Sequence, residues 1–239
     1  MATKFGFLSK LNFLQDWVSI FISKVNPAII HNVEKYYIIK KVHYLSAIED
    51  IEGDYLEFGV YTGSSFCHSL RCSKHTEKLN PHVAKTKFYG FDSFSGFGNI
   101  EEDDKHPFYT DSNFETSFIN VNNRVKRVSN GYIFKLVKGF FSETLKQGAL
   151  SLGIKQSRII FIDSDTYSSA NDALNFCIPT IVAGTFIIID DFFSYKGSLE
   201  KGVARAFNEF LINANIEVRE VFTYGMGGKV FVVSKRNDK

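Results

Sequence analysis

The chain has 239 residues, of which 44% are hydrophobic and 15% aromatic, enough apolar material for one large domain or two small ones. This composition excludes a disordered chain. Because 28 basic residues nearly balance 26 acidic ones, the net charge of +2 lacks the strong positive field of a dedicated DNA- or RNA-binding protein.

The first 47 residues are interpreted as an N-terminal helical extension that acts as a cap or an oligomer contact. No basic region followed by an apolar segment and a cleavage site is present, so no signal peptide is expected. A helix ending before Pro27 is predicted from an apolar stripe: Phe7, Leu11, Leu14, Val18, Phe21 and Val25. Packing against its own domain or a second subunit is favoured over a membrane surface, because the opposite face is only weakly basic. A second helix is expected over residues 31–45.

Residues 48–239 are predicted to form one α/β domain. Short runs rich in Val, Ile, Phe and Tyr alternate with helix-like segments, the pattern of a mostly parallel sheet with helices on both faces. Strands are expected at residues 55–60, 87–92, 133–138, 158–163, 185–190, 217–223 and 229–234. The Gly-rich turn 224–228 predicts that the last two strands form an antiparallel hairpin.

Helices are predicted at residues 64–75, 142–150, 168–182 and 199–213, each beginning at or near a serine that can cap it. The run 186–189 is apolar at every position, which is typical of a central strand covered on both faces. A long segment separates the second and third strands, and its part over residues 98–131 is interpreted as a lid-like insertion.

The ends of the first two predicted strands favour an adenosine-containing cofactor. Gly59 and Gly63 would let the backbone approach a ligand where the next helix begins. Asp92 ends the second strand, where an acid can accept hydrogen bonds from ribose hydroxyls. A tight structural turn is the alternative for the glycines, and the GxGxxG of a typical nicotinamide or flavin site is missing.

Four carboxylates follow the fourth and fifth strands: Asp163, Asp165, Asp190 and Asp191. Carboxylates crowded at one sheet edge raise one another's pKa unless a cation or a hydrogen-bond network holds them ionised. Oxygen-only ligands favour Mg²⁺, Mn²⁺ or Ca²⁺ over zinc. Helix capping and loop hydrogen bonding are the alternative, above all for Asp165.

The sequence resembles the class I S-adenosylmethionine-dependent methyltransferases, and among them the macrocin and mycinamicin sugar O-methyltransferase (TylF-type) family. The matching blocks are YLEFGVYTGSS (55–65), FYGFDSFSGF (88–97), LVKGFFSETL (136–145), IIFIDSDTYSSANDAL (159–174), GTFIIIDDF (184–192) and GVARAFNEF (202–210). The resemblance implies a Rossmann-like class I methyltransferase fold, with a seven-stranded, mostly parallel sheet and an antiparallel last strand.

The resemblance also implies which residues bind the cofactor and a metal. S-adenosylmethionine would be held by the following residues: Glu57, Gly59, Tyr61, Thr62, Ser64, Asp92, Ser93, Phe140, Phe141, Ser142 and Asp163. A divalent metal, expected to be Mg²⁺, would be bound by Asp163, Asp190 and Asp191. Catechol-type methyltransferases look similar but have a lysine shortly after the first metal acid, where this chain has Thr166.

The expected activity is metal-assisted methyl transfer to a hydroxyl of a sugar or a glycan-linked small molecule. The cation would lower the pKa of the hydroxyl and fix its direction, with Asp163, Asp165 and Asp191 as the catalytic candidates. Asp165, Asp191 or a lid residue such as His106 could take the proton. Tyr109 and Phe108 are candidate substrate contacts, although packing in the core of the lid is the favoured role for Phe108.

Two other functions remain open from the sequence: a nucleotide-dependent oxidoreductase on the same kind of sheet, and a non-catalytic cofactor-binding protein. The three cysteines form no CxxC pair, and no Asn-x-Ser/Thr site occurs, so a reduced, cytoplasmic location is expected. The expected partners are a small-molecule or sugar acceptor and further copies of the chain in a homo-oligomer, with no nucleic acid and no stable membrane insertion.

Overall fold

The computed structural model describes residues 11–109 and 114–237, and its centre is one seven-stranded sheet in the order β3-β2-β1-β4-β5-β7-β6. The strands are β1 (Asp54–Phe58), β2 (Phe88–Asp92), β3 (Phe134–Lys138), β4 (Ser157–Ile162), β5 (Phe186–Ile189), β6 (Ile216–Tyr224) and β7 (Gly228–Arg236). Strands β1 to β5 are parallel, whereas β7 runs antiparallel to both β5 and β6. The predicted fold, including the hairpin around residues 224–228, is confirmed.

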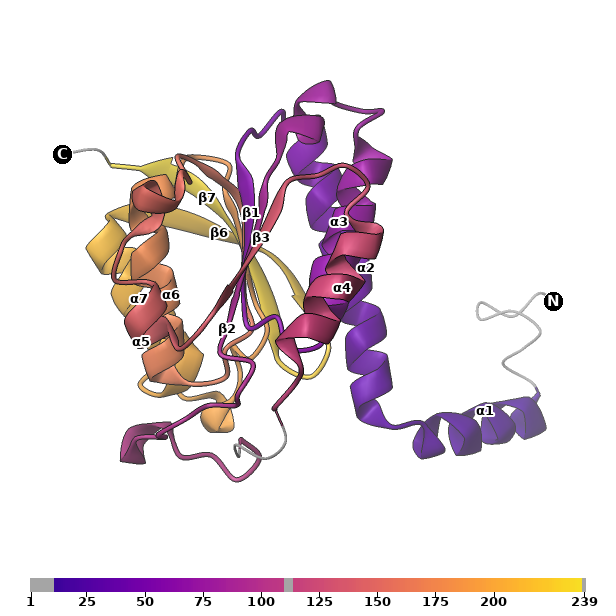
Figure 1. The fold of residues 1–239 in the computed structure, drawn as a ribbon. Helices are drawn as coiled ribbons and strands as arrows, with labels where there is room; N and C mark the ends of the chain where they lie inside the picture. Colours follow the sequence, from indigo (N-terminus) through magenta and orange to yellow (C-terminus); the bar gives the residue numbers. More distant parts are fainter. Residues whose placement is uncertain (1–10, 110–113, 238–239) are drawn as a thin grey trace.

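Helices cover both faces of the sheet (Figure 1). One layer contains α2 (Pro27–Ile48), α3 (Ser64–Thr76) and α4 (Phe118–Val128), and the other contains α5 (Phe141–Thr144), α6 (Tyr167–Cys177) and α7 (Gly202–Ala214). Short 3₁₀ turns lie at Pro81–Lys85, Glu102–Asp104, Ala149–Leu152, Ile178–Thr180 and Tyr195–Gly197. The order of the strands places the ends of β1, β2, β4 and β5 at one edge, where ligands bind in open α/β sheets.

Two helix predictions were too long, and one helix was not predicted. The helix expected at 142–150 is only the four-residue α5, because Gly148 has φ +75° and breaks the helical path before the following 3₁₀ turn. Helix α6 ends at Cys177 instead of 182, since Pro179 cannot donate to a continuing helix. The segment 98–131 contains α4, which the sequence analysis did not anticipate.

The caps also differ from the serine caps that were expected. The side chain of Thr166 caps α6 by accepting the backbone N–H of Ser169. Helix α3 follows Gly63, and α7 follows Lys201, neither of which gives a side-chain cap. Helix α2 begins four residues earlier than predicted because Asn26 accepts the N–H of Ala28 and Pro27 occupies the first turn.

The apolar core lies on both faces of the sheet. Strand β5 is fully buried, as predicted, with Ile187 and Ile189 in the cluster under α6 and α7. Phe186 and Ile188 point into the opposite cluster, which α2 and α3 cover. Burial of each such side chain contributes about 1.5–3 kcal/mol, so the two clusters hold the central strands in place.

Helix α1 (Asn12–Lys24) projects from the body of the protein at an angle to α2 (Figure 1). It has no buried residue, and the side chains of Trp17 and Phe21 are 71% and 68% exposed. The predicted apolar stripe is therefore uncovered over its described part; Phe7 lies outside the described residues. No helix within residues 11–109 and 114–237 is long and apolar enough to cross a membrane.

Candidate active site

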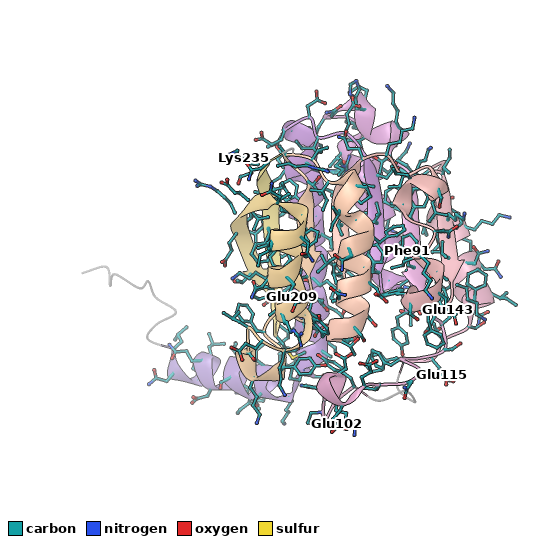
Figure 2. All side chains as sticks on the ribbon, turned by 90° about the vertical axis from the view of Figure 1, so that its left-hand side faces the viewer. Phe91, Glu102, Glu115, Glu143, Glu209 and Lys235 are labelled. Atoms are coloured by element: carbon teal, nitrogen blue, oxygen red, sulfur yellow. The ribbon has the colours of Figure 1, made fainter. Side chains whose placement is uncertain are left out.

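A cavity of about 740 Å³ opens at the carboxyl ends of β1, β2, β4 and β5. Its walls come from the loops after these strands, from the start of α2 and from the segment after β2. In Figure 2, Glu102 and Glu115 of that segment lie at the same end of the molecule, below α6. Seven of the predicted cofactor-binding residues line the cavity: Gly59, Tyr61, Asp92, Ser93, Phe140, Phe141 and Asp163. The other three aspartates of the predicted cluster line it as well.

The turn after β1 is built by backbone conformations that favour glycine. Gly59 has φ +94° and Gly63 has φ +75°, and Tyr61 between them also has a positive φ. The N–H of Tyr61 donates to the Asp92 carboxylate at 2.7 Å, and the other oxygen of Asp92 accepts the N–H of Phe94 at 2.6 Å. Asp92 thus holds the turns after β1 and β2 against each other at the floor of the cavity.

Glu57 is fully buried beneath this turn and does not line the cavity. Its carboxylate accepts hydrogen bonds from the hydroxyls of Ser65, at 2.6 Å, and Tyr55. Burial raises the pKa of Glu57 from 4.5 to about 7, against the opposing effect of the two hydroxyls. In this structure Glu57 connects β1 to the first turn of α3, which is a structural contact beside its predicted role at the cofactor.

Replacing Glu57 by glutamine should remove a pH-dependent part of the stability. Because the pKa of Glu57 is higher in the folded chain than in the unfolded one, its contribution is complete below about pH 4.5 and is lost as the pH rises through 7. The free energy of unfolding should therefore fall by about 3 kcal/mol more between pH 5 and pH 8 in the native chain than in Glu57→Gln. Urea unfolding of both proteins at the two pH values measures this difference, and equal pH dependence would contradict it.

Three further residues were predicted to bind the cofactor. Thr62, Ser64 and Ser142 are not among the lining residues. The carbonyl of Thr62 accepts a hydrogen bond from the Arg124 guanidinium of α4 at 2.8 Å, a contact that sequence reasoning missed. The roles of these three side chains at the cofactor stay predictions.

The four aspartates divide into two groups. Carboxylate oxygens of Asp163, Asp165 and Asp191 lie within 4.8 Å of one another. Burial and the neighbouring carboxylates raise the pKa of each of these three acids. Asp190 differs, because Lys35 and His31 outweigh the effect of burial and hold the pKa of this carboxyl below its usual range.

The group of Asp163, Asp165 and Asp191 fits a divalent cation that prefers oxygen ligands. Three carboxylates supply only oxygen atoms, and their raised pKa values indicate that they lack sufficient positive charge nearby. This set differs from the predicted one in that Asp165 replaces Asp190. Asp190 instead contacts Lys35 at 2.6 Å, His31 at 3.1 Å and the Tyr224 hydroxyl at 2.7 Å.

Lys35 and His31 are the site residues that the sequence analysis missed. They lie one turn apart on α2, so both project from the same face of that helix towards the cavity. The only signal in the sequence is two basic side chains spaced by four residues, in a segment that also contains Asn32 and Glu34. Nothing in that spacing says that the segment packs against the ends of β4 and β5.

The segment after β2 closes one side of the cavity. The Tyr109 hydroxyl donates to Asp191 at 3.1 Å and lies 2.8 Å from the Ser194 hydroxyl, while the His106 ring stacks on Tyr109 at 4.3 Å. The buried carboxylate of Asp104 accepts the Tyr167 N–H at 2.7 Å at the start of α6. Phe108 lines the cavity and is 65% exposed, and its ring contacts those of Tyr109 and Phe114 in the same segment.

Comparison with known proteins agrees with this fold. The family model for macrocin O-methyltransferase (TylF) matches residues 15–221. Mycinamicin III 3''-O-methyltransferase of Micromonospora griseorubida is 27% identical over 160 residues. That match covers 62% of this chain and 58% of the relative, so the chain spans less than two thirds of that protein.

Solved structures with a similar fold include several methyltransferases. The O-methyltransferase NovP superposes with a TM-score of 0.66 at 20% identity, over 84% of this chain and 79% of NovP. The calicheamicin methyltransferase CalS11 gives 0.65 at 18% identity, over 82% and 77%. An O-methyltransferase from Bacillus cereus in complex with SAH gives 0.54 at 16% identity, over 83% and 81%.

The family model extends over most of the sequence, and the strand order of the sheet is that of the class I methyltransferase fold. The chain belongs to the macrocin O-methyltransferase (TylF) family and has the class I methyltransferase fold.

Proposed function

We propose that the protein transfers a methyl group from S-adenosylmethionine to a hydroxyl of a sugar or a glycan-linked small molecule. The observation that carries this proposal is that Gly59 of the glycine turn, Asp92 and the aspartate group line the same cavity. A donor bound over β1 and β2 would thus lie beside the acids at the ends of β4 and β5. Mycinamicin III 3''-O-methyltransferase, whose name describes such a reaction, supports the same assignment.

The cofactor is proposed to lie along the wall formed by Gly59, Tyr61, Asp92 and Ser93. Two backbone N–H groups donate hydrogen bonds to the Asp92 carboxylate and fix its orientation. Its oxygens have further lone pairs that can accept hydrogen bonds from ribose hydroxyls. Phe140 is 38% exposed at the cavity wall, and this position suits an adenine ring. These contacts would hold the donor so that its methyl group faces the aspartates.

The acceptor is proposed to bind among aromatic side chains on the opposite wall. Phe97, Phe108, Tyr109 and Phe193 line the cavity there. Aromatic faces pack well against the C–H faces of sugar rings, and a few polar groups then fix the orientation of the ligand. Tyr109 connects the proposed acceptor wall to the aspartate group, because its ring contributes to this wall and its hydroxyl contacts Asp191.

Methyl transfer to an alcohol requires positioning and removal of a proton. Holding the hydroxyl in line with the sulfonium carbon can supply several kcal/mol of the barrier. Asp165 and Asp191 carry raised pKa values and lie at the cavity wall, which suits a carboxylate that accepts the hydroxyl proton. When bound at Asp163, Asp165 and Asp191, a cation such as Mg²⁺ would supply Lewis-acid chemistry to the acceptor oxygen.

Two measurements test this function. In thermal-shift experiments S-adenosylhomocysteine should raise the melting temperature, whereas NADH should not; the reverse result would favour the oxidoreductase. Labelled S-adenosylmethionine should then transfer label to glycosides or glycan extracts, with more transfer in Mg²⁺ than in excess chelator. Binding of the cofactor product without transfer to any such acceptor would favour a non-catalytic cofactor-binding protein.

We also infer that the protein forms a homo-oligomer through α1 and that it is cytoplasmic. The support for self-association is the uncovered apolar surface of α1, and that for the location is the set of three unpaired cysteines. Removing residues 1–25 should reduce the particle size measured by light scattering coupled to chromatography. A particle of unchanged size would show that α1 is not the oligomer contact.

A further inference from the structure

Lys35 is a nearly buried lysine whose charge is directed at the aspartates of the site. The residue is 8% exposed, and its ammonium lies 3.0 Å from an oxygen of Asp163 and 2.6 Å from an oxygen of Asp190. The ammonium also lies 5.7 Å from the centre of the Phe161 ring. An ion pair in such a position differs from a surface pair, because few water molecules screen it.

Asp190 has a partner on each of its two oxygens. Oδ1 accepts the Tyr224 hydroxyl at 2.7 Å, and Oδ2 contacts both Lys35, at 2.6 Å, and His31, at 3.1 Å. Its oxygens are not part of the group that Asp163, Asp165 and Asp191 form. Asp190 is thus adjacent to the candidate cation site in sequence but is engaged by protein donors in the structure.

The position of Lys35 is fixed from outside the aspartate group. One turn before it, His31 accepts the N–H of Met226 on Nδ1 at 3.1 Å, so its remaining N–H lies on Nε2 and donates to Asp190. Glu34 accepts the N–H of Gly225 at 2.5 Å. Helix α2 is therefore joined to the β6–β7 turn at two residues of the helical turn before Lys35, and the ammonium of Lys35 has a defined place.

We propose that Lys35 is a built-in counter-ion of the aspartates: it takes the place beside Asp190 that a divalent cation would otherwise take, and it weakens binding of such a cation at Asp163, Asp165 and Asp191. Lys35 is a positioning residue, because it acts on the acids and on the cation they hold. The inference rests on the cation site of the proposed function.

The competition follows from charge and from shared ligands. Asp163 belongs both to the cation group and to the ion pair with Lys35, so an ammonium and a divalent cation would share one carboxylate. The ammonium of Lys35 and a divalent cation are both positive, and positive charges beside one carboxylate repel each other strongly where water is excluded. Removal of the ammonium leaves Asp190 without its closest cation and close to Asp163, which makes it available as an additional ligand.

The test is a Mn²⁺ titration of the full chain, followed by the electron paramagnetic resonance signal of free Mn²⁺. Replacing Lys35 by methionine, which preserves the length and apolar stem of the side chain, should lower the Mn²⁺ dissociation constant at least tenfold. Lys40→Met removes the same charge from an exposed position on the same helix and should change it less than twofold. A merely structural role of Lys35 would predict weaker binding in Lys35→Met, and unchanged or weaker binding would overturn the inference.

Asp190 gives a second measurement that does not require Lys35→Met to fold. In the otherwise unchanged chain, Asp190→Asn should alter Mn²⁺ affinity less than threefold, whereas Asp191→Asn should lower it more than tenfold. In the Lys35→Met background, Asp190→Asn should reverse most of the gain. Equal losses of Mn²⁺ affinity from Asp190→Asn and Asp191→Asn in the unchanged chain would show that Asp190 binds the cation despite Lys35, which would overturn the inference. Absence of Mn²⁺ binding in every variant would also overturn it. Binding of S-adenosylhomocysteine, measured in parallel, tests the cofactor proposal separately.

Discussion

Replacing Asp191 by asparagine should lower the rate of methyl transfer by about 100- to 10,000-fold, the range by which a positioned acid or base accelerates a proton transfer. Asp191 lies in the cation group with Asp163 and Asp165, and it accepts the hydrogen bond from Tyr109. The substitution preserves the shape of the side chain but removes the negative charge. It should therefore affect both the proposed proton acceptance and the proposed cation binding while leaving the fold intact.

The measurement is the initial rate of label transfer at saturating S-adenosylmethionine, together with the dissociation constant of S-adenosylhomocysteine. The dissociation constant should change less than threefold, because Asp191 lies at the end of β5 and the proposed cofactor wall is formed by the turns after β1 and β2. Asp172→Asn, on α6 and outside the lining of the cavity, serves as the control. Retention of more than a tenth of the activity in Asp191→Asn would exclude Asp191 from the chemical step.

Replacing Gly59 by alanine should cost about 4 kcal/mol or more of the free energy of unfolding and abolish binding of S-adenosylhomocysteine. A Cβ at this position would lie 1.7 Å from the carbonyl oxygen of Asp163, which is backbone and cannot move aside without disturbing β4. The Gly59 N–H bonds to the Phe91 carbonyl, and the Asp163 N–H bonds to the Phe58 carbonyl. Any shift of this turn therefore disturbs the cofactor wall and the aspartate group together.

Gly131→Ala is the control that measures how much of the loss in unfolding free energy comes from the backbone conformation alone, without the collision of the new Cβ. Its φ of +89° is close to the +94° of Gly59, but a Cβ there would have no described atom within 4 Å. Gly131→Ala should therefore cost only about 1–3 kcal/mol, from the strained conformation alone, and should leave cofactor binding unchanged. Urea unfolding and isothermal titration of the two variants provide the comparison. Equal losses would mean that φ, and not the approach of β1 to β4, determines the need for glycine at Gly59.

The strands could be predicted from the sequence because their burial leaves a direct pattern in it. The run 186–189 is apolar at every residue since both faces of β5 are covered, and this pattern identified the central strand. Helix α4 shows the same kind of signal in Phe118, Val121, Val125 and Val128, which are spaced by three and four residues. That pattern predicts a helix within the segment interpreted as a lid, and the structure has one there.

The candidate site could be predicted only in part. Strand order and parallel direction bring the ends of neighbouring strands to one edge, so the clustering of Asp92, Asp163 and Asp191 followed from the fold class. The direction of each side chain did not follow. Glu57 sits in the motif that resembles a cofactor loop but turns into the protein towards Ser65 and Tyr55.

By itself the sequence determined the sheet, its glycine turn and the gathering of acids at one edge, because these depend on local hydrophobic pattern and on the regular geometry of parallel strands. Only the tertiary structure decided the electrostatics of that edge. The cations beside the acids come from α2, and Lys35 is 128 residues from Asp163 in the chain. Pairing over such a separation depends on how a helix packs against a distant strand end, and that packing has no local signature in the amino-acid sequence.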